Sequence, residues 1–362
     1  MSAGLTAAWG VRGFIEAGGV YTAYQRGGPE GAPVVILLHG SPESADAVVG
    51  VAGALSDRFD VVGLDTPGNG LSEGLAPDAP ESADYARHVL RVMEALGVRR
   101  AGVYGFHTGA GTAMSLALSA PERVAALALD GYAVWTAEER ADLLAHYLVT
   151  FPPRLDGAHL ASIWARLEAQ LVFFPWYDAR LAARMDLPDT PMSVRLRRLR
   201  DWLCAPETYV KPYAAAFRRV GEEGPDRVEV PTLIGASAPD PLSAHLDRLS
   251  DLSAAVTVER WGADRAEAFD AIARHFAAHP GDPAGEPLVA SAPPPVFAEA
   301  PHDLPWSPDR HGGFLLEIWR SLAARVIAHA DSEPALAAGL DPQALQSRLL
   351  THVARHTGLI AD

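Results

Sequence analysis

The residues best able to do chemistry in this sequence are one imidazole and two carboxylates that follow short apolar runs. His107 stands two residues from a glycine on each side in the run GFHTG at 105–109, which suits a tight turn. Asp130 closes the run VAALALD, and Asp240 stands in the turn-like run APDPLS. An imidazole titrates near neutral pH and can act as a general base or as a nucleophile. A carboxylate beside His107 would orient the ring, and the sequence leaves open whether Asp130 or Asp240 does so.

Alternating apolar runs and helical patterns predict the elements that must position these side chains. The strand-like runs lack the in/out alternation of half-exposed strands, as expected where a sheet is covered on both faces. Segments with apolar residues at helical spacing separate them. This order predicts an α/β protein with a mostly parallel, doubly wound sheet. Strands are expected at 34–40, 61–65, 101–105, 124–130, 231–237 and 254–261, and helices at 82–97, 108–120 and 264–277.

The chain is predicted to divide into a core, an inserted helical cap, a linker and a tail. Residues 1–134 and 226–279 carry the strand signals and would form the core. Residues 135–225 are helical in pattern and rich in aromatic side chains, so they would form the cap. Residues 280–308 are rich in proline and read as a linker. Residues 309–362 would form an extra C-terminal helical segment.

The predicted tail resembles part of the predicted cap. The stretch GGFLLEIWRSLAA at 312–324 aligns without gaps on GAHLASIWARLEA at 157–169. The two stretches share a glycine, a tryptophan and four aliphatic positions. A chance match between two amphipathic helices is the alternative to a duplication, and the shared glycine and tryptophan favour duplication.

The composition excludes several classes of function. Hydrophobic residues make up 49% and charged residues 21% of the 362 positions, which is typical of a soluble globular protein. With 45 acidic and 30 basic residues, the chain has no basic excess to bind nucleic acid or an anionic membrane. Its single cysteine, Cys204, excludes an internal disulfide framework and a cysteine-based zinc site. No apolar run is long enough to cross a bilayer and no secretory signal is apparent, so we expect a cytoplasmic protein.

Three motifs in order resemble those of the α/β-hydrolase superfamily. They are LLHGSPESA at 37–45, LDTPGNGLSEG at 64–74 and YGFHTGAGTA at 104–113. The resemblance covers about residues 10–277. It implies an α/β-hydrolase fold whose cap is inserted after the strand that ends at Asp130.

The chain departs from that superfamily at two positions. The third motif contains the nucleophile elbow, Gly105-Phe106-His107-Thr108-Gly109, in which serine, aspartate or cysteine usually takes the place of His107. The superfamily's catalytic histidine follows the last strand, but the segment RWGADRAEAF at 260–269 contains no histidine. The resemblance also places the catalytic acid at Asp130 or Asp240.

The resemblance further implies an oxyanion site and a substrate pocket under the cap. The oxyanion donors would be the backbone N–H groups of Ser41 and Thr108. The aromatic cap favours a small to medium, partly apolar substrate. No metal-ligand cluster or nucleotide-binding loop is evident, so we expect no metal and no cofactor. The candidate pocket residues are Glu43, Phe106, Tyr132, His159, Trp164 and Trp176.

These features predict an α/β-hydrolase-fold enzyme with an atypical site centred on His107. The foremost hypothesis is hydrolysis of an ester, lactone or similar acyl bond, with His107 as nucleophile or as base for water. The second is a cofactor-free lyase, cyclase or other proton-transfer enzyme. The third is an inactive ligand-binding homologue, because fold alone does not fix function. A small molecule is the expected partner, and the sequence leaves homodimerisation through the cap or tail open.

Overall fold

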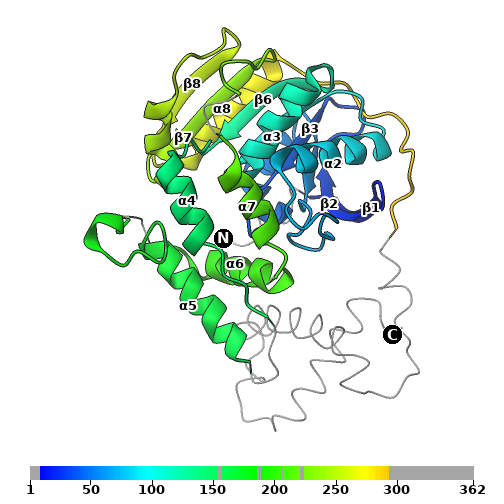
Figure 1. Ribbon diagram of the computed structural model, residues 1–362. Helices are drawn as coiled ribbons and strands as arrows, with labels where there is room; N and C mark the ends of the chain where they lie inside the picture. The colour runs from blue at the N-terminus through cyan, green and yellow to red at the C-terminus, as the bar shows by residue number, and fades with distance from the viewer. Residues whose placement is uncertain are drawn as a thin grey trace, which may run out of the picture.

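The computed structural model describes residues 9–292, except 153–156, 186, 188, 206 and 221–223. An eight-stranded sheet in the order β1-β2-β4-β3-β5-β6-β7-β8 forms the centre of the molecule (Figure 1). Strands β1 and β2 run antiparallel to their neighbours, and the remaining pairs are parallel. The strands are β1 (Val11–Glu16), β2 (Tyr21–Gly27), β3 (Val34–Leu38), β4 (Asp60–Leu64), β5 (Ala101–Phe106), β6 (Val124–Asp130), β7 (Thr232–Ser237) and β8 (Val256–Trp261).

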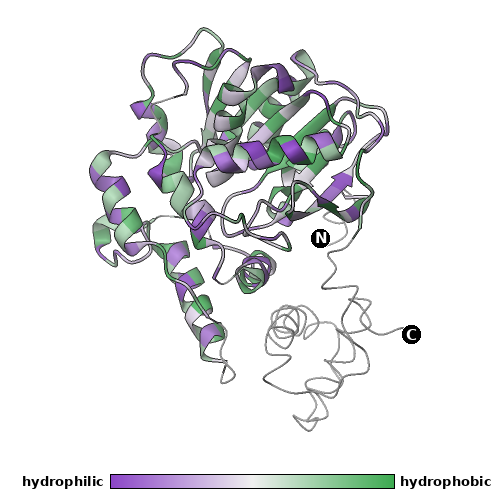
Figure 2. Cartoon of the chain, turned by 45° about the vertical axis from the view of Figure 1, so that its right-hand side comes forward, coloured by the Kyte–Doolittle hydropathy of each residue, from purple (hydrophilic) through white to green (hydrophobic). Residues whose placement is uncertain are grey.

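Helices cover both faces of this sheet, which explains why its central strands are continuously apolar. Every residue of β3, β4 and β6 is buried. One face packs against α2 and α3, and the other packs against α1 and α8. Figure 2 shows the central strands mostly hydrophobic, whereas the covering helices carry both colours. These helices are α1 (Val49–Leu55), α2 (Ser82–Ala95), α3 (Thr108–Ser119) and α8 (Arg265–Ala278), and the short 3-10 helices are η1 (Ala45–Val48), η2 (Pro121–Arg123), η3 (Leu181–Ala183) and η4 (Pro241–Arg248).

Four further helices lie between β6 and β7, and we call them the cap helices. They gather below the sheet in Figure 1. The first begins at a capping box, in which Thr136 accepts from the backbone N–H of Glu139 and Glu139 accepts from that of Thr136. The cap helices enclose an aromatic core of their own around Trp202 and Tyr209. They are α4 (Ala137–His146), α5 (Ala158–Val172), α6 (Met192–Cys204) and α7 (Val210–Arg218).

The mostly parallel sheet agrees with the sequence prediction, and the two antiparallel strands are additions to it. Strands β1 and β2 are not among the predicted elements, because their sequences mix apolar with polar and glycine residues. The start of the predicted linker is attached to the core: Val34 donates to Asp282, and Leu288 donates to Ala95. The domain boundaries stay predictions, and the predicted tail at 309–362 lies outside the described residues. Within the described part of the chain, no helix combines the length and hydropathy that a membrane span requires.

Candidate active site

His107 occupies the turn between β5 and α3. Its backbone has φ 47° and ψ −108°, a conformation with positive φ that residues other than glycine rarely adopt. The turn is tight because α3 starts directly against β3: a Cβ atom on Gly109 would lie 2.4 Å from the carbonyl oxygen of Leu38. Such a turn lifts the His107 side chain out of the sheet, so that it lines a cavity beneath the cap helices.

The His107 ring is hydrogen-bonded to Asp240, which follows β7. The Nε2 atom of His107 lies 2.7 Å from Oδ2 of Asp240, while Oδ1 of Asp240 accepts from the N–H of Leu242. The His107 side chain is 30% exposed and that of Asp240 is 8% exposed. The carboxylate is therefore held on one oxygen by the start of η4, and its other oxygen meets the imidazole.

Each member of this pair shifts the pKa of the other. Burial alone would lower the pKa of His107, but the charge and hydrogen bond of Asp240 raise it above the ordinary value. Burial alone would raise the pKa of Asp240, but His107 lowers it below the ordinary value. Asp240 is thus ionised and Nε2 of His107 carries the proton between them. Among the residues that the structure describes, Nδ1 of His107 has no hydrogen-bond partner.

Two neighbours fix the plane of the His107 ring. Phe106 stacks on it, with the ring centroids 3.8 Å apart and an interplanar angle of 19°. On the side of β6, a Cβ atom at Gly131 would lie 2.4 Å from Cδ2 of His107 and 2.7 Å from Nε2. Gly131 is not among the site residues expected from the sequence. The signal was present, because a glycine directly after a buried strand often marks a close approach.

Asp130, the other candidate acid, belongs to a separate network. Its carboxylate accepts from Nη2 of Arg265 at 2.6 Å and from the hydroxyl of Tyr104 at 2.9 Å. Only the backbone carbonyl of Asp130 meets His107, whose N–H it accepts at 3.0 Å. Arg265, which also contacts Ser237, lies at the start of α8. It is not among the site residues expected from the sequence.

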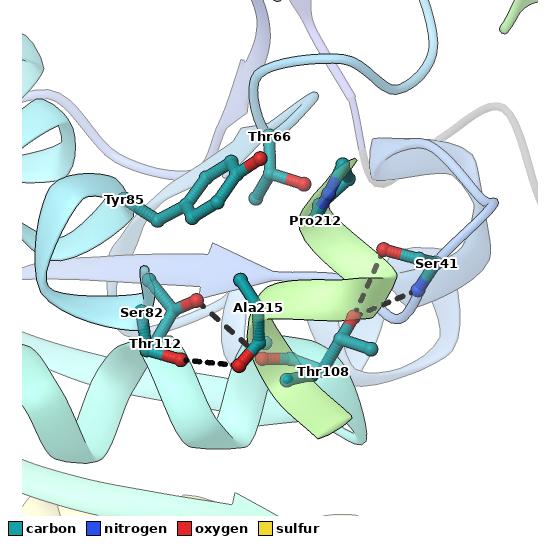
Figure 3. A pocket seen from close by; sticks show the side chains of 10 residues that line it. Ser41, Thr66, Ser82, Tyr85, Thr108, Thr112, Pro212 and Ala215 are labelled. Atoms are coloured by element: carbon teal, nitrogen blue, oxygen red, sulfur yellow. Dashed lines mark hydrogen bonds between the residues drawn. The ribbon is translucent and has the colours of Figure 1, made fainter. Parts of the chain in front are cut away.

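One of the two expected oxyanion donors already has a partner within the protein. The backbone N–H of Ser41 donates to Oγ1 of Thr108 at 2.8 Å, and the two hydroxyl oxygens lie 3.1 Å apart (Figure 3). The amide of Asn69 lies 3.4 Å from the Ser41 hydroxyl. The hollow beside them measures about 10 Å³, the room of one water molecule. In this structure the Thr108 hydroxyl therefore takes the place that an oxyanion would take at the Ser41 N–H.

The cavity that His107 lines has a volume of about 150 Å³ and lies between the core and the cap helices. Thr108 lines it beside His107, and the cap contributes aromatic and aliphatic walls. Its polar lining residues from the cap side are Gln170, Arg198 and Arg219. The aromatic lining residues are Trp135, Tyr147, Phe174, Tyr213 and Phe217.

None of the six pocket candidates named from the sequence is among the described residues that line this cavity. Glu43 is ion-paired with two arginines of α6, and Phe106 is stacked behind His107. Tyr132 is fully buried, with Arg219 above its ring. The other three belong to the cap: His159 is buried on α5, Trp164 packs in the aromatic core of the cap, and Trp176 donates to the carbonyl of Tyr147.

The described residues contain no group of three or more side chains placed to hold a metal ion. The polar groups that meet at the cavity are instead an imidazole–carboxylate pair, a threonine hydroxyl, an amide and guanidinium groups. Such a set can accept a proton, donate hydrogen bonds to an oxygen atom and hold an apolar molecule.

Comparison with known proteins gives the same fold. A family model described as the alpha/beta hydrolase fold matches residues 33–143, from the start of β3 into α4. The dihydrolipoyllysine-residue acetyltransferase component of the acetoin cleaving system from Cupriavidus necator is 35% identical over 116 residues, which are 32% of this chain and 30% of that protein. A putative carbamate hydrolase from Klebsiella pneumoniae subsp. pneumoniae is 32% identical over 155 residues, which are 42% of this chain and 55% of that protein. The chain thus spans less than a third of the length of the first of these curated relatives and about half of the length of the second.

Among solved structures, epoxide hydrolase A from Mycobacterium thermoresistibile is similar with a TM-score of 0.58 and 17% identity. The match covers 78% of this chain and 99% of that one. At this identity the likeness concerns the fold alone. Together with the family match, it confirms the fold class expected from the three motifs.

Proposed function

This chain has the α/β-hydrolase fold, and from that premise we propose that it is an enzyme whose reaction centre is His107. The reaction that the geometry supports best is hydrolysis of an ester, lactone or similar acyl bond in a small to medium, partly apolar molecule. One observation carries this proposal: the His107 ring, at the elbow and bonded to Asp240, lines the cavity between the core and the cap helices and keeps one nitrogen without a partner in the described chain. The relative named as a putative carbamate hydrolase supports acyl-bond cleavage.

In this proposal His107 acts as a general base on water. The Nδ1 atom takes a proton from a water molecule as the water oxygen bonds to the acyl carbon, and the carbonyl π electrons move to oxygen. The tetrahedral intermediate then expels the alkoxide, which takes the proton from Nδ1. The products are an acid and an alcohol, and His107 returns to its starting state. Asp240 stabilises the imidazolium that exists between the two steps.

A base role suits His107 better than a nucleophilic role. Since Asp240 accepts from Nε2, the lone pair left for reaction is on Nδ1, next to the ring carbon that carries the side chain. A small water molecule reaches such a nitrogen more easily than a bulky acyl carbon does. The stack on Phe106 further restricts rotation of the ring.

Thr108 supplies the hydrogen bond to the developing oxyanion. Its Oγ1 accepts from the N–H of Ser41 and lies 3.1 Å from the Ser41 hydroxyl. When the Ser41 hydroxyl donates to Oγ1, the Thr108 O–H proton is available for a substrate oxygen in the cavity that Thr108 also lines. Hydrogen bonds in such a chain strengthen one another. The N–H of Ser41 would thus act through the threonine hydroxyl rather than directly.

The same contact supports a second candidate function, a proton-transfer reaction without hydrolysis. A hydroxyl that occupies the Ser41 N–H leaves fewer direct donors for a tetrahedral intermediate than two open amides would. A lyase or cyclase that moves a proton at His107 needs only one good donor for an enolate or alkoxide. The two candidates differ in whether water enters the product.

The test is turnover of a panel of aryl esters and lactones by the wild type, His107→Ala and a matched control, His146→Ala. His146 lies on α4 with its side chain 61% exposed and does not line the cavity. We expect hydrolysis by the wild type and the control and none above background by His107→Ala. Activity that survives in His107→Ala would overturn the assignment of the centre.

Solvent exchange separates the second candidate from the first. If no ester or lactone is hydrolysed, deuterium exchange into carbon acids in D₂O that depends on His107 would support proton transfer. If the wild type binds ligands but shows neither turnover nor exchange, the chain is an inactive homologue.

A further inference from the structure

The cavity carries positive charge in a protein that is strongly acidic. The whole chain has a formal net charge of −15. The described residues that line the cavity nevertheless include Arg198, Arg219 and His107, and none of them is Asp or Glu. The positive charge comes from the two arginines, because the carboxylate of Asp240 lies against the His107 ring. The sign of the cavity is thus opposite to that of the molecule, which favours an anionic ligand.

Arg198 is only partly neutralised by its acidic neighbour. The carboxylate of Glu43 is shared, because it lies 3.4 Å from Nη2 of Arg197 and 3.5 Å from Nε of Arg198. The Arg198 side chain is 36% exposed and keeps its two terminal nitrogens beyond these contacts. Burial by itself would raise the pKa of Glu43, yet the two arginines lower it, so Glu43 is ionised. Its single negative charge is shared between Arg197 and Arg198.

A second cation, Arg166, lies buried behind the cavity wall. The residue is 3% exposed, and its guanidinium lies 4.3 Å from the ring centroid of Trp176 and 4.8 Å from that of Tyr147. Its Nε and Nη2 atoms are buried without a hydrogen-bond partner, and no carboxylate among the described residues pairs with it. A buried guanidinium that faces aromatic rings rather than a carboxylate leaves a positive potential around it.

A hydrogen bond connects Arg166 to Gln170, which lines the cavity. Nη1 of Arg166 donates to Oε1 of Gln170 at 2.6 Å. A guanidinium has no acceptor, so the amide oxygen must face it and the amide NH₂ must face elsewhere. Gln170 lines the cavity, and the structure shows no partner for that NH₂ group within the described chain. The wall therefore offers hydrogen-bond donors from α5 and from α6, and both suit an oxygen-rich anion.

We propose that the cavity recognises a carboxylate-bearing molecule, with the carboxylate held by Arg198 and the NH₂ group of Gln170. The apolar body of the molecule lies among aromatic residues such as Trp135 and Phe217. This inference rests on the proposed function, in which the bond that reacts lies at His107. It narrows the substrate class to organic acids that also contain a cleavable acyl bond, or another centre open to proton transfer.

The first experiment compares two ligands of the same shape on the wild-type full chain. Isothermal titration with 4-phenylbutanoate and with 4-phenylbutanamide measures the contribution of the charge. We expect the carboxylate to bind at least ~10-fold more tightly, and its advantage to shrink as salt screens the charges. Equal affinities, a preference for the amide, or no binding of either ligand would overturn the proposal.

Two variants and one matched control locate the site. Arg198→Gln and Gln170→Glu should each reduce the preference for the carboxylate ~10-fold or more, and Gln170→Glu does so by placing a negative charge in the wall. Arg195→Gln is the control, because Arg195 lies on the same helix but pairs with Glu168 and Asp189 and does not line the cavity. The assignment would be contradicted if Arg195→Gln lost the preference for the carboxylate to the same extent. It would also be contradicted if both test variants kept that preference.

The titration and the turnover assay together distinguish this inference from the proposed function. Carboxylate preference without any turnover by the wild type would leave the binding assignment standing and remove the hydrolytic proposal. Turnover that depends on His107, combined with equal affinity for both ligands, would do the reverse.

Discussion

A methyl group on Gly131 would lie 2.4 Å from Cδ2 of His107, well inside van der Waals contact. The backbone of Gly131 has φ +68°, and its N–H donates to the carbonyl of Gly235 on β7. This hydrogen bond fixes the backbone of Gly131 next to the His107 ring. The imidazole can reach Asp240 only because this position has no side chain. The pair of His107 and Asp240 thus depends on a glycine that directly follows a third strand, β6.

Gly131→Ala should therefore impair catalysis by moving the His107 ring. We expect kcat/KM to fall ~100-fold, as for other small displacements of a catalytic group. The control is Gly157→Ala, since Gly157 also has a positive φ of +74° but only Leu160 lies near its Cβ position, at 3.8 Å. Both variants should lose ~1 kcal/mol of stability from backbone strain. Equal activities of the two variants would show that the contact with His107 does not matter.

The pH dependence of turnover should report the His107 pKa. A general base must be unprotonated, and Asp240 raises the pKa of His107 against the effect of burial. The rate should therefore be low in acid and rise as pH increases through a value above 6.5. Asp240→Asn removes the negative charge, so the rise should move to lower pH while the plateau falls ~10-fold or more. A profile of kcat/KM with an unchanged midpoint in Asp240→Asn would argue against this pair.

Thr108→Val and Thr108→Ser test the hydroxyl at the Ser41 N–H. Valine keeps the size of threonine but removes both the acceptor for Ser41 and the donor for substrate. We expect Thr108→Val to lower kcat ~10- to 100-fold with little change in KM, because the hydrogen bond matters most in the transition state. Thr108→Ser should retain most activity. Faster turnover by Thr108→Val would mean instead that the Thr108 hydroxyl blocks the Ser41 N–H, which would then bind the oxyanion directly.

Asp130→Asn should reduce stability more than it reduces catalysis at the His107 nitrogen. The Asp130 carboxylate is fully buried and bonded to Arg265 and Tyr104, and it touches His107 only through its backbone. Loss of its charge leaves Arg265 without its partner, and we expect a decrease of ~2 kcal/mol in the free energy of unfolding. Urea titration measures this decrease. An unchanged unfolding midpoint, with a shifted pH profile of kcat/KM, would assign the orienting role to Asp130 after all.

The sequence alone predicts the order of the parallel strands and the helices between them. It does so because continuous apolar runs such as VVILL and VAALALD can be buried only in a sheet covered on both faces. It also places His107 at a turn between a strand and a helix, since the flanking glycines permit that turn. Strands β1 and β2 carry no such run, and their pairing depends on neighbours elsewhere in the chain.

Only the tertiary structure decides between the two candidate acids. Asp130 ends β6 and Asp240 follows β7, the neighbouring strand, and their local sequences are equally suitable. The Asp130 carboxylate accepts hydrogen bonds from Arg265 and Tyr104. The start of η4 instead binds one oxygen of Asp240 and leaves the other for the His107 ring. Likewise, the six pocket candidates share the residue types of a lining, but the cavity is bounded by other side chains of the cap. Residue type and local pattern determine which elements form; the direction of a side chain depends on partners distant in sequence, which only the folded chain brings together.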